Sequence, residues 1–203
     1  MKYEQFIKVL QETKPTTRVL VEDLRRIVNE RHEGVGQVAF RFFEDFPGAQ
    51  LGSFTWLEDE RTSPYQDPFN DAIVFINDRY RNDREMIRLI AAKELMHVFD
   101  TDEQKTDSPE KYKTLLKQIE SSPIVDDQSE QYAADRVALW KATIALVPPC
   151  IRSEYLEGWR NGEIKAPEIS AKLWLPDATI SACMGDYYDV AVERFLSEKA
   201  GQA

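Results

Sequence analysis

The sequence predicts an α+β fold in which an N-terminal helix precedes a three-stranded sheet and a helical C-terminal half. Three observations support this prediction. Apolar residues recur at helical spacing within residues 15–31, and they alternate or are rich in β-branched types between residues 38 and 77. After Asn82 the apolar positions return to helical spacing up to the end of the chain.

The N-terminal helix is predicted over Pro15–Arg31, with Thr16 or Thr17 as its N-cap. Its apolar positions fall on one helical face: Val19, Leu20, Leu24, Ile27 and Val28. Such a stripe is typical of a helix that packs on a core with one side only.

Three strands are predicted next. Apolar residues alternate with others over Val38–Phe42 and over Leu51–Leu57, and Pro47-Gly48 between these segments is a turn signal. The first two strands are therefore predicted to form an antiparallel pair. The third, Ala72–Asn77, is apolar on both faces, which predicts a more buried strand.

The rest of the chain is predicted to be helical, with Asn82 and Glu85 forming a capping box at its start. The predicted helices are Asp83–Phe99, one beginning at Ser108-Pro109, Asp127–Leu146, Ile151–Arg160, Pro167–Leu173 and Asp177–Lys199. Residues 1–150 are expected to form the main domain, and residues 151–203 a helical extension packed on it.

Composition narrows the classes of function. The net charge is -10, so binding to nucleic acid through phosphate contacts is not expected. The sequence has no apolar segment long enough to cross a membrane, and no signal peptide is recognised at Met1. Its two cysteines lie outside any C-x-x-C motif. A cytoplasmic protein without a membrane partner is the expectation.

A candidate functional site is suggested by Lys93-Glu94-Leu95-Met96-His97, in the helix that follows the third strand. Residues four apart share a helical face, so Lys93 and His97 should project together with Glu94 beside them. In the H-E-x-x-H motif of zinc peptidases two histidines in this arrangement hold the metal, and the glutamate is the general base. By itself the pentapeptide is equally compatible with a solvated helix face. The acidic residues that follow, Asp100, Asp102 and Glu103, are predicted to form a solvated loop.

Together, these segments resemble the core of the ImmA/IrrE-type metallopeptidases. The resemblance covers the strand ending in Ile76-Asn77 and the helix ending in Lys93-Glu94-Leu95-Met96-His97. It continues through Gln131-Tyr132-Ala133-Ala134-Asp135 to Ile144-Ala145-Leu146-Val147-Pro148, in the order in which that family carries its motifs. The resemblance implies a zincin-like fold.

The departures from that family's pattern fall on its metal site. Lys93 stands at the position of the first zinc histidine, and Gln131 stands at that of the glutamate ligand. A lysine ammonium has no lone pair to donate, and a glutamine brings no charge. Only Glu94, as a vestigial general base, and His97 keep the family's residue types. No cofactor is therefore expected. Zinc would be expected only if the family's metal site were retained. If any metal binds, His97 is the expected ligand.

The leading hypothesis is a non-catalytic or weakly catalytic, regulatory metallopeptidase-like protein that binds a protein or peptide partner. The resemblance suggests a transcriptional repressor of the helix-turn-helix class as the partner, in a prophage, another mobile element or a stress response. A second hypothesis is an active peptidase with rearranged ligands, in which Glu94 and His97 are joined by carboxylates such as Glu130 around a metal like manganese. A third is a plain α+β interaction domain.

A structural prediction separates the first hypothesis from the third. If Lys93 faces the former metal cleft, its ammonium should replace the metal as the positive charge there. Asp135, one turn after Gln131, is the expected partner, whereas Glu94 is expected to point away from Lys93.

Overall fold

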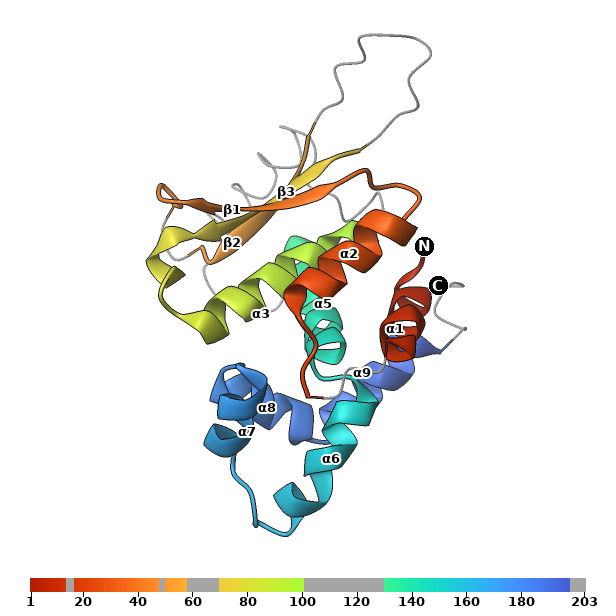
Figure 1. Ribbon diagram of the computed structural model, residues 1–203, viewed down its shortest axis with the longest axis vertical. Coiled ribbons are helices and arrows are strands. Elements are labelled where there is room, and N and C mark those ends of the chain that lie inside the picture. The colour runs from red at the N-terminus through yellow and green to blue at the C-terminus, as the bar shows by residue number, and fades with distance from the viewer. Residues whose placement is uncertain (14–16, 48–49, 58–69, 101–129, 198–203) are drawn as a thin grey trace, which may run out of the picture.

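A computed structural model describes residues 1–13, 17–47, 50–57, 70–100 and 130–197, with only the backbone at 130–133. Within these ranges the chain is α+β, with N-terminal helices, a mixed three-stranded sheet and a helical C-terminal half (Figure 1). The predicted helix at Ser108 lies outside the described residues. No helix among the described residues is long and apolar enough to cross a membrane.

Two helices, rather than the predicted single one, precede the sheet: α1 (Tyr3–Glu12) and α2 (Val21–Arg31). The buried side of α1 follows helical spacing. Its members are Tyr3, Phe6, Ile7 and Leu10. The predicted helix started too early, because α2 begins after Leu20, which has no side-chain cap, and Thr17 lies outside the helix.

The sheet contains β1 (Val38–Phe43), β2 (Gly52–Trp56) and β3 (Ala72–Asn77). Its order is β1-β3-β2, with β1 parallel and β2 antiparallel to β3. The predicted antiparallel pairing of the first two strands is therefore wrong. β3 is apolar on both faces and takes the buried centre, whereas β1 and β2 carry exposed positions and form the edges.

Helix α3 (Arg84–Leu95) follows the sheet and continues as a 3-10 turn, η2 (Met96–Phe99), within the predicted Asp83–Phe99 segment. Its N-cap is Asp83, whose side chain accepts the N–H of Met86, so the predicted cap at Asn82 is wrong. The helix packs on β2 and β3 with one side and on α5 with another. This double packing explains why α3 buries a charged residue, Glu94.

The helical half contains five helices among the described residues. They are α5 (Glu130–Leu146), α6 (Pro149–Arg160), α7 (Ala166–Leu173), α8 (Asp177–Met184) and α9 (Tyr187–Leu196). The predicted last helix is two helices, since Gly185 ends α8 in an extended conformation. Helix α5 links the sheet-bearing half to the C-terminal helices (Figure 1).

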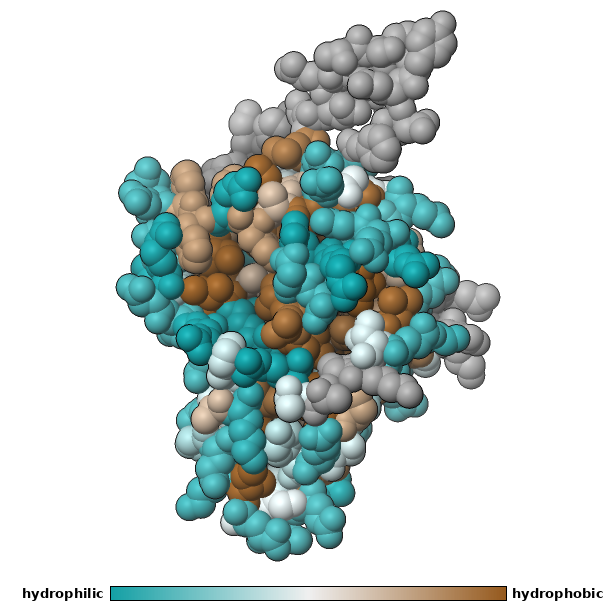
Figure 2. All heavy atoms as spheres, viewed as in Figure 1, coloured by the Kyte–Doolittle hydropathy of each residue, from teal (hydrophilic) through white to brown (hydrophobic). Residues whose placement is uncertain are grey.

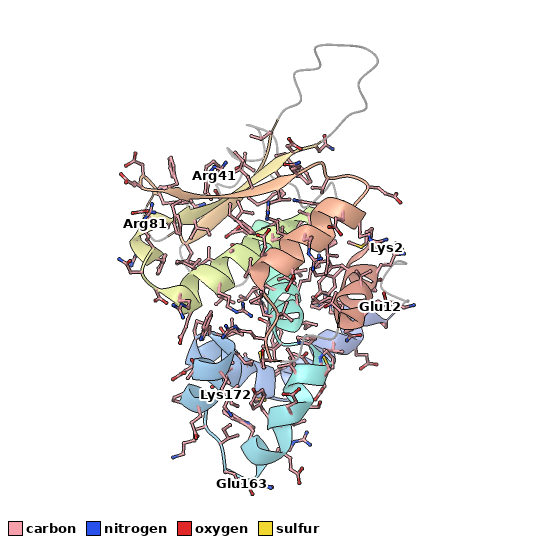
Figure 3. The ribbon with its side chains drawn as sticks, in the orientation of Figure 1. Lys2, Glu12, Arg41, Arg81, Glu163 and Lys172 are labelled. Carbon is pink, nitrogen blue, oxygen red and sulfur yellow. The ribbon has the colours of Figure 1, made fainter. Side chains whose placement is uncertain are left out.

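Buried hydrogen bonds join α1 and α9 to α5 and to the residue that follows it. Tyr3 of α1 donates its hydroxyl to the carbonyl of Lys141 at 2.6 Å, and Tyr188 of α9 donates to that of Val147 at 2.6 Å. Arg41 and Arg81 mark the sheet end of the molecule, and Glu163 and Lys172 mark the opposite end (Figure 3). Hydrophilic residues are spread over the viewed face of both halves (Figure 2).

Candidate functional site

The predicted motif lies where α3 passes into η2. Lys93 and Glu94 end the α-helix, and His97 sits in the 3-10 turn. Strand β2 approaches this turn so closely that a Cβ on Gly52 would lie 3.1 Å from Cγ of Glu94. The ring of Phe54 lies 6.3 Å from that of His97. Helix α5 packs against α3 and η2 and brings Asp135 to the same place.

Lys93 is the cation at the centre of this site. Its Nζ lies 2.9 Å from Oε1 of Glu94 and 2.6 Å from Oδ1 of Asp135. The Lys93 side chain is 18% exposed and that of Glu94 only 4%. Burial alone lowers the pKa of Lys93, but the two carboxylates outweigh burial and raise the pKa above its ordinary value. Lys93 is therefore an ammonium ion at neutral pH.

His97 is a second cation, because both of its ring nitrogens face carboxylates. Nδ1 lies 2.6 Å from Oδ2 of Asp100, and Nε2 lies 3.3 Å from Oδ1 of Asp135 and 3.7 Å from Oε2 of Glu94. Burial lowers the pKa of His97, but the bonds to Asp100 and Asp135 and the charge of Glu94 raise it to about 9. At neutral pH His97 is an imidazolium with no lone pair for a metal.

The carboxylates differ in environment. Glu94 is buried, and burial raises its pKa against the opposing effect of Lys93 and His97. Burial also raises the pKa of Asp135, but His97 and Lys93 outweigh it and lower that pKa to about 2. Asp100 is 4% exposed, and its Oδ1 has no hydrogen-bond partner. The charge of Asp100 acts on buried Lys141, whose Nζ donates to the carbonyl of Phe99 at 3.3 Å.

The structure confirms that Lys93, Glu94, His97 and Asp135 lie together, and that Lys93 pairs with Asp135. The expectation that Glu94 points away from Lys93 is wrong, since the flexible lysine bends back to it. Gln131 lies in α5, one turn before Asp135, but its side chain and that of Glu130 are outside the described residues.

Asp100 is the site residue that the sequence prediction missed. It was expected in a solvated loop, and instead it is buried against His97; Asp102 and Glu103 lie outside the described residues. The available signal was its position three residues after His97, which one turn of helix brings to the same side.

The described side chains around His97 do not fit a zinc ion. Both nitrogen-bearing side chains, Lys93 and His97, are protonated at neutral pH, and the Glu94 carboxylate is bonded to the ammonium. In the described part of the chain, no group of three or more His, Cys, Asp and Glu side chains is placed to hold a metal. Since Glu94 already accepts a hydrogen bond from Lys93, it is also poorly placed to activate a water molecule.

Comparisons of the chain with protein-family models, with curated proteins and with solved structures found no match. The interpretation of the site therefore depends on its own residues: a closed network of buried and half-buried ion pairs.

Proposed function

We propose that this chain is a non-catalytic relative of the ImmA/IrrE-type metallopeptidases, with a zincin-like fold, and that it acts by binding a protein partner. One observation supports this most: the Lys93 ammonium lies between Glu94 and Asp135, beside His97, where the family resemblance would put a metal ion. A cation fixed by the chain itself preserves the site's charge balance and occupies oxygens of Glu94 and Asp135 that a metal would need.

The arrangement around the motif agrees with this proposal. A strand, a motif-bearing helix and a later helix follow one another in the order that the resemblance implies. The later helix, α5, packs on the motif turn and supplies Asp135. The pair of His97 and Asp100 also resembles the carboxylate that orients a metal-binding histidine from behind.

The edge of β2 offers a place for a partner. The N–H of Leu57 donates to the carbonyl of Asp71 at 2.8 Å, and the N–H of Asn77 donates to that of Leu51 at 2.9 Å. Because bonding alternates along an antiparallel pair, Phe54 directs its N–H and C=O away from β3. Among the described residues no strand pairs with β2 on that side. An extended peptide added there would run past His97.

The partner class follows from the family resemblance. We propose that it is a helix-turn-helix repressor, which the chain binds without cleaving. Recognition through an edge strand needs backbone hydrogen bonds and not a metal, so it can persist after the metal ligands have been replaced.

The experiment mixes the purified chain with helix-turn-helix repressors from its own organism, with and without added zinc. Gel filtration measures the complex, and a denaturing gel measures cleavage. Two variants test the edge: Phe54→Pro removes both the ring and the outward N–H, and Phe54→Ala removes the ring alone.

We expect the chain to form a complex with the repressor and to leave the repressor uncleaved. Phe54→Ala should still form this complex, whereas Phe54→Pro should not. Repressor cleavage that depends on zinc would contradict the non-catalytic role. Equal binding by the two variants would remove β2 from the interface, and the absence of any complex would overturn the proposed partner.

A further inference from the structure

Two arginines contact one indole at the opposite end of α3 from the candidate site, and a third lies close by. Cζ of Arg18 lies 3.2 Å from the centroid of the Trp174 ring, and Cζ of Arg84 lies 4.2 Å from it. Both guanidinium groups are therefore in contact with the same ring, and the two charges are near neighbours. Arg88 follows Arg84 by one turn of α3, and its pKa is lowered by burial and by the charge of Arg18.

Among the described residues, none of the three arginines forms an ion pair. The nearby Glu85 instead accepts a hydrogen bond from Ser170 of α7 at 3.3 Å. In a chain with a net charge of -10, three neighbouring guanidinium groups without a carboxylate are unexpected.

Arg88 makes the imbalance costly. It is 7% exposed, one of its terminal nitrogens donates to the carbonyl of Val19, and its Nε has no hydrogen-bond partner. A buried guanidinium with an unused donor loses hydration without recovering it in the protein. An anion that accepted from Nε would supply both the missing bond and the missing charge.

Trp174, which Arg18 and Arg84 contact, has a strained backbone conformation. Its φ of 54° and ψ of 55° make it the one described non-glycine residue in the left-handed region. The residue ends α7, a position where glycine is the usual choice. Strain of this kind persists where surrounding contacts fix the residue, and it is concentrated at binding sites.

We propose that Arg18, Arg84 and Arg88 form a binding site for a phosphate group. Each guanidinium presents a planar pair of donors that matches phosphate oxygens. A phosphate carries up to two negative charges and has enough oxygens for several forks, whereas a carboxylate carries one charge and two oxygens. Arg84 is exposed and Arg88 is buried, so the site would have an open side and a closed base. This inference is independent of the proposed function.

Inorganic phosphate is the probe. The melting temperature of the full chain is measured in sodium phosphate and in sodium chloride of equal ionic strength, and the dissociation constant is measured by calorimetric titration. We expect phosphate to raise the melting temperature, and Arg84→Gln to weaken phosphate binding by about tenfold or more, the loss of one charged fork. The matched control is Arg160→Gln, which removes an exposed arginine of α6 and should leave binding unchanged.

Arg88→Leu should abolish the rise in melting temperature that phosphate causes. If Arg88→Leu does not fold, Arg84→Gln provides the test. Equal melting temperatures in the two salts, or equal weakening by Arg84→Gln and Arg160→Gln, would overturn the proposal. A short phosphoserine peptide measured beside inorganic phosphate identifies the source. Tighter binding of the peptide points to a phosphorylated partner, and equal or weaker binding points to free phosphate; either result supports the site.

Discussion

Replacing Lys93 with methionine tests whether its ammonium neutralises the buried charge of the site. Methionine keeps the length and helix propensity of lysine but removes the charge. In Lys93→Met, Glu94 loses the bond that its Oε1 accepts at 2.9 Å, and Asp135 loses the ion pair at 2.6 Å. Among the described residues, His97 is then the one remaining cation that contacts both carboxylates.

The two losses differ in size because the two carboxylates differ in exposure. Asp135 is 57% exposed, so water replaces most of what the ammonium provided, and this pair contributes little. Glu94 is 4% exposed and cannot be rehydrated without opening the site. Leaving a buried charged group without its partner costs about 1–3 kcal/mol. We therefore expect Lys93→Met to lower the free energy of unfolding by about 2 kcal/mol, nearly all of it from Glu94.

Urea denaturation followed by circular dichroism measures this change. The control is Lys8→Met, which removes an exposed lysine of α1 and should change stability by less than about 0.5 kcal/mol. Adding Glu94→Gln to Lys93→Met should recover part of the loss, because it removes the stranded charge. If Lys93→Met is as mild as Lys8→Met, the ammonium does not neutralise the site and our reasoning is refuted.

Three further predictions concern the surroundings of the site and the C-terminal helices. The pKa of His97 is raised from 6.5 to about 9 in the folded chain. Protonated His97 therefore stabilises the fold fully below pH 6.5, and this stabilisation is lost as the pH rises through 9. Stability should fall by about 2–3 kcal/mol as pH rises through 9. Urea melts across pH should show His97→Gln flattening this dependence and His32→Gln preserving it. Gly52→Ala should lower the free energy of unfolding by about 1–3 kcal/mol in the same assay, because the added Cβ would lie 2.8 Å from a backbone carbonyl oxygen. The control is Gly34→Ala, which should be nearly neutral because the nearest atom to its added Cβ is at 3.5 Å. Arg152→Lys should cost about 2 kcal/mol by thermal melting, because lysine cannot reproduce the bonds at 2.7 and 2.8 Å to α8 and α9.

Periodicity predicted the type of most elements, and pairing was where it failed. The apolar run of β3 and the helical spacing of α3 both correspond to elements in the structure. The turn signal at Pro47-Gly48 suggested that β1 and β2 pair with each other. In the structure β3 separates them, because a strand that is apolar on both faces is stabilised most at the centre of the sheet. Partner choice depends on burial over the whole sheet, which local alternation does not encode.

Part of the site was also predictable. The four-residue spacing predicted that Lys93 and His97 share a helical face, and the family resemblance indicated Asp135 of the later helix as the partner of Lys93. The burial of Asp100 was not predicted, because it depends on η2 turning the chain back toward α5. The approach of β2 at Gly52 likewise depends on tertiary packing.

Metal content tests the central claim most directly. The chain, purified without chelators, is analysed for zinc, manganese and iron beside the variant Lys93→His with Gln131→Glu. We predict no stoichiometric metal in the natural chain, and zinc-dependent thermal stabilisation in the double variant, which rebuilds three ligands around His97. One equivalent of zinc in the natural chain, lost in His97→Ala, would contradict the account.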